Sequence, residues 1–470
     1  MTSRHLVAKF LTAAAGAIFL ALAVTRRLNF DEALALRAGW LDLAGEPSAP
    51  AFLMPWTLFA GTVGHLLSDP GAVFVCLRLA AAGGLMYAFV VAMRAAEVSQ
   101  PGLAAVAWLA LANAAFATHA IEFRYDAAVL ILLMIAYRML AAGSSPIALG
   151  AIAGVLALHH LKGAFYAVGV GAILLLLSTD RRRDLGRFVA GAGAALSTWT
   201  LLLLALGLLK RQAESLATFF SLAAASERAP LMTTLGSVLR RDLAWWLLVL
   251  VAICRVLMLH RDERTERRDL VALSLAALGI GFWLVHPRAW AYLAALPVPF
   301  LLLIVARTFG QGWRNLRWPT IAAASGLVLQ LASGAAPLFG HLPRAFAASM
   351  RAEVEMLRQL RIDATPADRV LDPSGVVYFV PPCTEQWYLD TLFADRTAAG
   401  EWMRELQFDL PADCTLALDT YRLSALPPNA RRALGSGFRR LASGLAVRRD
   451  RPLRPQAESV SGSGSVESFW

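Results

Sequence analysis

Charged residues, and lysine above all, are scarce in this chain of 470 residues. Only 16% of the residues are charged and 58% are hydrophobic, with a mean hydropathy of +0.56, whereas about a quarter of a soluble domain is charged. Just three of the 44 cationic residues are lysines (Lys9, Lys162 and Lys210), so an isolated arginine is weak evidence for a site. The lack of charge excludes an ordinary soluble domain and indicates a membrane protein.

Cysteine is also rare, and the four cysteines lack the spacing of a metal site. Cys76 and Cys254 fall inside apolar runs, where a small buried hydrophobic residue is expected. Cys383 and Cys414 could pair if their segment faces an oxidising compartment, or they could remain free thiols. We expect neither a metal nor a cofactor.

The surplus of positive charge belongs to the hydrophobic part of the chain. Residues 1–340 hold 28 Lys and Arg against 17 Asp and Glu, while residues 341–470 hold 16 of each. These cations lie between apolar runs and do not form a patch on a soluble face. They therefore indicate membrane topology and argue against nucleic-acid binding.

Apolar runs long enough for helices divide most of the chain into about eleven membrane spans. They cover residues 6–24, 72–93, 101–118, 126–141, 145–159, 163–178, 188–209, 242–259, 269–285, 289–306 and 318–338. A further apolar stretch, residues 51–67, could be a short span or a helix lying in the membrane interface. If this stretch is interfacial, the short basic loops lie on the cytoplasmic side, as the positive-inside rule requires.

This topology places both the first loop and the tail on the extracytoplasmic side of an inner, multi-pass membrane protein. Residues 1–340 form the membrane domain, with a first outer loop at 25–70. Period-two patterns at 369–372, 376–380 and 415–419, with a helix at 398–406, predict a small α/β domain over 341–455. Residues 456–470, rich in Ser and Gly, are predicted to be disordered. The expected fold is thus mainly α, a polytopic helical bundle with a small extracytoplasmic α/β domain.

Two carboxylates follow the first span closely. Asp31 and Glu32 lie a few residues after Arg26 and Arg27, so an acid near the membrane surface stands beside cations. Such a pair suits a reaction on a phosphorylated lipid, in which a carboxylate removes a proton from a hydroxyl and cations hold the departing phosphate. The alternative is a helix cap, because acids favour the first turn of a helix.

Several cations on the outer side are not explained by topology, and phosphate contact would explain them. They are Arg26, Arg27, Arg78, Arg124, Lys162, Arg240 and Arg241. Snorkelling to anionic head groups is the alternative at helix ends, and a structural ion pair is the alternative for Arg124 with Asp126.

Four more residues could line a cavity on the outer side: Asp126, His160, His286 and Tyr292. Helix capping and an interfacial aromatic belt would also account for His286 and Tyr292. The pair His159–His160 lacks the i, i+4 spacing of helical ligands, which argues against a metal site.

The order of these features resembles the GT-C superfamily of membrane glycosyltransferases, particularly the branch of protein O-mannosyltransferases and aminoarabinose transferases. The resemblance covers about residues 1–310 and rests on six pieces that share one side of the membrane. These are Asp31-Glu32, the stretch Pro50 to Leu67, Leu77-Arg78-Leu79, Arg124-Tyr125-Asp126, Leu161-Lys162-Gly163 and the helix from Tyr292 to Pro297.

The resemblance implies a sugar donor linked to a polyprenyl monophosphate, a hydroxyl acceptor and the lipid bilayer as partners. It also implies that Asp31 is the general base of a single inverting displacement, with Glu32 orienting either the acceptor or Asp31 and the cations stabilising the leaving phosphate. A transporter of lipid-linked sugars would need inverted repeats, and none is visible in the sequence. A non-catalytic membrane scaffold would not require the carboxylates and cations at the rim.

Overall fold

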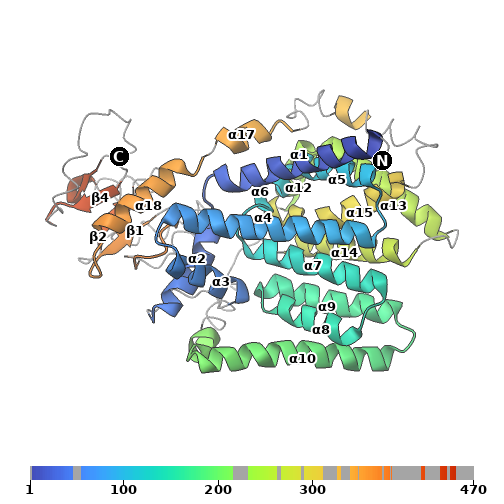
Figure 1. Cartoon of the computed structure of the whole chain (residues 1–470), viewed down its shortest axis with the longest axis horizontal. Coiled ribbons are helices and arrows are strands. Elements are labelled where there is room, and N and C mark those ends of the chain that lie inside the picture. The colour runs from blue at the N-terminus through green and yellow to red at the C-terminus, as the bar shows by residue number, and fades with distance from the viewer. Residues whose placement is uncertain are drawn as a thin grey trace. The chain divides into compact units, whose positions relative to one another are not determined.

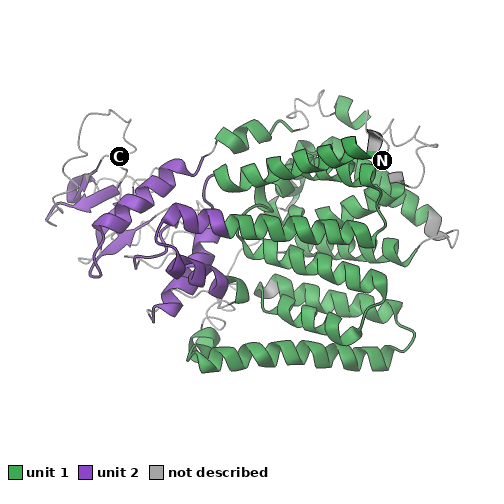
Figure 2. Cartoon of the chain, viewed as in Figure 1, with its two compact units in different colours: residues 1–26, 54–56, 77–348 green, residues 27–53, 57–76, 349–470 purple. Residues whose placement is uncertain are grey.

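The computed structural model describes most of the helical part of the chain and parts of the tail. The described residues are 3–45, 54–214, 231–261, 266–286, 291–310, 325–329, 339–347, 349–372, 375–381, 383, 414–418, 435–441 and 445–450. The chain divides into two compact units (Figure 2). Unit 1 comprises residues 1–26, 54–56 and 77–348, and unit 2 comprises residues 27–53, 57–76 and 349–470.

Unit 1 is a bundle of apolar helices (Figure 1). Its helices are α1 (Ser3–Thr25), most of α4 (Pro70–Ala95), α5 (Gln100–Ala112), α6 (Ala114–His119), α7 (Tyr125–Ala142), α8 (Pro146–Ala157), α9 (His160–Leu177), α10 (Arg181–Ala205), α12 (Leu231–Arg241), α13 (Leu243–Arg261), α14 (Arg267–Val285), the 3-10 helix η1 (Ala291–Ala295), α15 (Val298–Gly310) and α17 (Leu342–Ala347). Five of the described helices are long and apolar enough to cross a membrane, and five shorter ones are also apolar. The polytopic helical fold is therefore confirmed, while eleven spans stays a prediction.

Local sequence signals set many of the helix ends. Ser99 caps α5 by accepting a hydrogen bond from the backbone N–H of Gly102, with Pro101 in the first turn. Gly143 ends α7 in the left-handed conformation, with φ +66°, which glycine adopts without strain. Because these signals are local, α7 matches the predicted span at 126–141 to within one residue at each end.

Close backbone contact joins α8 to α10. A Cβ atom added at Gly150 would lie 2.0 Å from the carbonyl oxygen of Phe188, and one added at Gly191 would lie 2.0 Å from that of Ile147. Small residues allow helix backbones to approach in this way, as in many membrane bundles. The remaining surface of α10 is largely exposed, which suits a helix that faces lipid.

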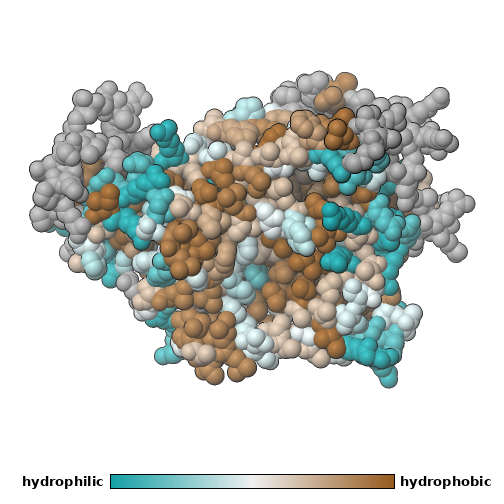
Figure 3. All heavy atoms as spheres, viewed as in Figure 1, coloured by the Kyte–Doolittle hydropathy of each residue, from teal (hydrophilic) through white to brown (hydrophobic). Residues whose placement is uncertain are grey.

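The exposed surface of unit 1 is also rich in apolar residues. Figure 3 shows hydrophobic residues over much of the visible face of the bundle and hydrophilic residues gathered where helices end. Cys76 and Cys254 are exposed rather than buried, so the expectation of buried cysteines is wrong. On a lipid-facing helix an exposed thiol carries little penalty, because the surrounding phase is apolar as well.

An apolar pocket of about 80 Å³ lies in unit 1 between α1, α4 and α5. Phe19, Phe89 and Phe116 are among its lining residues.

Unit 2 combines the first loop with the tail. It contains α2 (Phe30–Leu43), most of α3 (Pro55–Leu66), α18 (Arg351–Asp363) and a four-stranded sheet. The sheet order is β1 (Arg369–Leu371), β2 (Cys414–Leu418), β4 (Leu445–Arg448) and β3 (Phe438–Arg440). β1 is parallel to β2, and the other two pairs are antiparallel. The small α/β fold of the tail is therefore confirmed.

The tail differs from the sequence prediction at residues 376–380, which do not form a strand. The carboxylate of Asp372 explains the difference, because it accepts hydrogen bonds from the backbone N–H groups of Gly375 (2.9 Å) and Val377 (2.7 Å). These donors are thereby used in a turn instead of a strand ladder. The helix predicted at 398–406 and the tail at 456–470 lie outside the described residues.

A disulfide joins Cys383 to Cys414, with 5.1 Å between their Cα atoms. It attaches the chain after β1 to the first residue of β2. The two alternatives left by the sequence are thus decided in favour of pairing.

Side chains of the first loop and the tail hold unit 2 together. Arg27 donates from Nε to Glu353 Oε1 at 2.8 Å, and Arg358 contacts Asp69 through two hydrogen bonds of 2.6 and 3.0 Å. The ring of Tyr378 packs edge-on against Trp40. The loop residues of unit 2 therefore pack with the tail, although the sequence prediction assigned them to the membrane domain; the domain boundaries stay a prediction.

Candidate functional site

A buried charged cluster lies in unit 1, where the turn after α6 leads into α7. We define the charged cluster as Arg26, His119, Glu122, Arg124, Asp126, Lys162 and Tyr292. α6 ends at His119 and α7 begins at Tyr125, so the intervening turn presents Glu122 and Arg124. Asp126 lies in the first turn of α7, where the helix dipole favours a negative charge.

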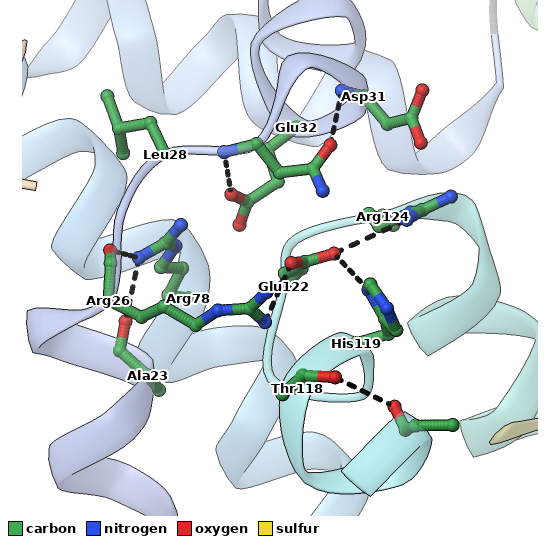
Figure 4. Close-up of polar contacts among 12 residues, drawn as sticks. Ala23, Arg26, Leu28, Asp31, Glu32, Arg78, Thr118, His119, Glu122 and Arg124 are labelled. Atoms are coloured by element: carbon green, nitrogen blue, oxygen red, sulfur yellow. Dashed lines mark hydrogen bonds and ion pairs between the residues drawn. The ribbon is translucent and has the colours of Figure 1, made fainter. Parts of the chain in front are cut away.

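Glu122 is the centre of one half of the cluster (Figure 4). Its Oε1 lies 2.9 Å from Nη1 of Arg26, at the end of α1, and its Oε2 lies 3.3 Å from Nδ1 of His119 and 3.4 Å from Nη1 of Arg124. The residue is only 1% exposed. Burial opposes ionisation of this carboxyl, but the charges of His119, Arg124 and Arg26 lower its pKa below the usual range of a glutamate.

Asp126 is the centre of the other half. Lys162, from the first turn of α9, donates from Nζ to Asp126 Oδ1 at 2.8 Å, and Arg124 Nε lies 3.5 Å from Oδ2. The ring of Tyr292, from η1, lies 3.9 Å from Cζ of Arg124 and 4.8 Å from Nζ of Lys162. Both cations are therefore held by a carboxylate and by an aromatic face.

Three cations and two carboxylates meet in the charged cluster. Arg26 and Arg124 contact Glu122, while Arg124 and Lys162 contact Asp126. Arg124 and Lys162 are 4% and 6% exposed, so water screens their charges weakly. Such a site favours an anion, and a planar guanidinium beside an ammonium suits phosphate oxygens.

Arg78 supports the charged cluster by binding the backbone at the end of α1. Its guanidinium, fully buried on α4, donates to the carbonyl oxygens of Ala23 (3.2 Å) and Arg26. These carbonyls belong to the end of α1, where helices leave acceptors without helical partners. Arg78 therefore fixes the chain at Arg26 (Figure 4), and a direct phosphate contact of its own stays a prediction.

An aromatic stack supports the same turn. Trp56 lies over Phe123, with ring centroids 4.3 Å apart and planes 10° from parallel. Phe123 separates Glu122 from Arg124 in sequence and is fully buried. The stack therefore holds the segment that carries both charges.

Asp31 and Glu32 lie in the first turn of α2, in unit 2. Asn29 caps this helix by accepting from the backbone N–H of Asp31 at 2.9 Å, and Glu32 Oε2 accepts from the backbone N–H of Asn29 at 3.0 Å. This is a capping box. The structure thus gives Glu32 the capping role that the sequence left as the alternative, whereas the carboxyl of Asp31 is half-buried and its role as a base stays a prediction.

The remaining predicted site residues lie elsewhere. Arg27 pairs with Glu353 in unit 2, Arg240 is exposed in the last turn of α12, and Arg241 forms an ion pair with Asp242 at 3.7 Å. His286 follows the last residue of α14, with its ring against Phe282, and the side chain of His160 lies outside the described part.

Sequence reasoning missed Glu122 and His119 as site residues. Their signal was weak, since each is a single polar residue in a short turn, and the partner Arg26 lies almost a hundred residues earlier. Within the described ranges, no group of three or more His, Cys, Asp or Glu side chains lies close enough to hold a metal ion.

The described residues form a bundle of apolar helices and a small α/β unit. Solved structures with a similar fold include two of one protein. ArnT from Cupriavidus metallidurans bound to undecaprenyl phosphate aligns with a TM-score of 0.59 and 14% identity over 95% of this chain and 98% of that one. The apo state of the same protein aligns with a TM-score of 0.59 and 14% identity over 98% and 100%. No family model and no curated protein matches the sequence.

At 14% identity this likeness shows the fold. The fold that the sequence resemblance implied is therefore confirmed.

Proposed function

We propose that this protein is a membrane glycosyltransferase that moves a sugar from a polyprenyl-phosphate donor to a hydroxyl acceptor. The observation that carries the proposal is the charged cluster, which brings three cations together in a buried site of unit 1. ArnT, whose fold the chain has, binds undecaprenyl phosphate. A lipid phosphate is the anion that a membrane-embedded cationic site of this kind suits.

The proposed reaction is a single inverting displacement. Asp31 removes the proton from the acceptor hydroxyl, and the resulting oxygen attacks the anomeric carbon of the donor. The bond between that carbon and the phosphate oxygen breaks, and the prenyl phosphate leaves with the electron pair. Arg124 and Lys162 stabilise the charge that develops on the phosphate, while Glu32 supports Asp31 through the capping box.

We assign the reaction to the extracytoplasmic side, with unit 2 outside an inner membrane. The disulfide between Cys383 and Cys414 supports this assignment, because such bonds persist in oxidising compartments. The basic connection beginning at Arg181 supports it from the opposite side, since positive loops stay in the cytoplasm.

The test is transfer from a labelled donor in membranes that supply the native acceptors. Membranes containing the protein receive polyprenyl-phosphate sugars carrying labelled hexoses, pentoses or aminopentoses, and the loss of label from the lipid is followed. We expect Asp31→Asn to abolish transfer and Asp42→Asn, the same change on the same helix, to preserve it. Full transfer by Asp31→Asn would reject the assigned base.

A second pair of variants tests the phosphate contact. Lys162→Met should weaken binding of undecaprenyl phosphate, because it removes a buried cation from the charged cluster. Lys210→Met removes an exposed lysine, whose side chain is 89% exposed, and should leave binding unchanged. Equal binding by both variants would contradict the role of Lys162, and a wild-type protein that moves the lipid-linked sugar without cleaving it would indicate a transporter.

A further inference from the structure

The span predicted over residues 101–118 is broken. α5 ends at Ala112 and α6 begins at Ala114, with Asn113 between them in an extended conformation. Asn113 caps the new helix, since its Oδ1 accepts from the backbone N–H of Phe116 at 2.9 Å. A helix interrupted in an apolar bundle leaves backbone donors and acceptors that need partners.

Asp242 supplies a second partner at this break. It lies in the turn between α12 and α13, and its Oδ1 accepts from the backbone N–H of Ala114, the first of α6, at 3.4 Å. The indole of Trp245, one turn later, donates to the carbonyl oxygen of Leu109 at 3.1 Å. Asp242 and Trp245 thus form hydrogen bonds with backbone atoms on both sides of the break.

The position is costly for a carboxylate. Asp242 is 3% exposed, and its second oxygen, Oδ2, is 3.7 Å from Arg241 Nε and has no hydrogen bond within the described ranges. Burial disfavours the charged form of such a carboxyl. A polar group buried in an apolar bundle costs free energy unless it is hydrogen-bonded, and the contact with Ala114 offsets part of that cost.

The helix that Asp242 holds leads directly to the charged cluster. α6 has six residues, too few to be stable without tertiary contacts. Its last residue, His119, contacts Glu122 and the ring of Tyr292. A shift at the start of α6 would therefore be passed to His119 and to the turn that carries Glu122 and Arg124.

We propose that Asp242 is a positioning residue of the charged cluster, which acts by fixing the start of α6. It touches none of the charged-cluster residues in the described contacts and works through the helix backbone. The inference rests on the proposed function for its effect on turnover, but its structural part can be measured without any substrate.

The first measurement is hydrogen exchange of the wild-type protein and three variants in lipid nanodiscs. Asp242→Ala removes the acceptor, Asp242→Asn keeps an oxygen in its place, and Asp180→Ala removes a comparable cap that accepts from Arg183 N–H at the start of α10. We expect the amides of residues 114–119 to exchange about 2- to 30-fold faster in Asp242→Ala, as for a lost helix cap. Asp242→Asn should restore slow exchange, and Asp180→Ala should affect α10 alone.

The second measurement uses undecaprenyl phosphate as the probe and a labelled polyprenyl-phosphate sugar for turnover. We expect Asp242→Ala to lower kcat/KM by about 10- to 100-fold, the scale of a misplaced site group, with recovery in Asp242→Asn and wild-type values in Asp180→Ala. Unchanged exchange of residues 114–119 in Asp242→Ala, or equal losses of turnover in Asp242→Ala and Asp180→Ala, would overturn the inference. A wild-type protein without donor turnover would defeat the proposed function, and exchange would still decide the role of Asp242.

Discussion

Replacing Glu122 by Gln tests the central element of the charged cluster. The change keeps the shape of the side chain and removes its charge. Glu122 is 1% exposed and contacts Arg26, His119 and Arg124 at 2.9 to 3.4 Å. Without the carboxylate, Arg26 and Arg124 lose a buried negative partner.

The expected loss follows from the burial. Removing one partner of a buried ion pair costs about 3–5 kcal/mol, because the remaining charge stays buried without compensation. At about 2 °C per kcal/mol for a large domain, the melting temperature should fall by about 6–10 °C. The control is Glu97→Gln, which breaks an ion pair with Arg268 at an exposed site where the side chain is 69% exposed. Exposed pairs contribute little, so the control should melt close to the wild type.

The assay is thermal unfolding of the purified protein in nanodiscs across a range of pH. The lowered pKa of Glu122 means that its contribution is complete above the pKa of an unfolded glutamate and is lost as the pH falls through the lower, folded value. The gap between the wild type and Glu122→Gln should therefore be full at pH 7 and narrow below about pH 4.3. Equal melting temperatures for Glu122→Gln and Glu97→Gln at pH 7 would refute the reasoning.

Two further predictions concern unit 2. Gly39→Ala should destabilise the protein by about 1–3 kcal/mol, as overpacking does, because the added Cβ would lie 1.8 Å from the carbonyl oxygen of Thr57. The control Gly186→Ala, on a helix with open space at that point, should leave the stability unchanged. Similar melting temperatures for the two variants would contradict this prediction. Cys383 and Cys414 should react with a thiol-specific polyethylene glycol only after reduction. Reduction should lower the free energy of unfolding by about 3–4 kcal/mol, because the two cysteines are 31 residues apart. Labelling of these cysteines before reduction would contradict the disulfide.

The helices could be predicted because their signals are local. Apolar runs, proline after a serine cap and glycine after the last turn predict the start of α5 and both ends of α7 to within one residue. The break at Asn113 could not be predicted, since Asp242, which supports the start of α6, comes 128 residues after Ala114. Residues 376–380 were predicted as a strand for a similar reason. Their period-two pattern does not show that Asp372 accepts a hydrogen bond from the backbone N–H of Val377.

The site was predicted in part. The cations Arg26, Arg124 and Lys162 were singled out, and the structure brings all three into one cluster through contacts with Glu122 and Asp126. Arg27 and Arg78 have structural partners in the protein, and their contacts with phosphate stay predictions. Charge alone cannot separate these cases, because the direction of each side chain depends on which helix packs beside it.

The contact between α8 and α10 has a practical consequence for handling the protein. Because backbone atoms of Gly150 and Gly191 make this contact, it depends on short-range dispersion forces and contains little polar attraction. Small, mobile detergents that solvate helix surfaces compete well with such forces. We expect α10 to be the first helix to detach on harsh solubilisation, so mild detergents with bulky tails, or native lipid, suit purification of the intact bundle.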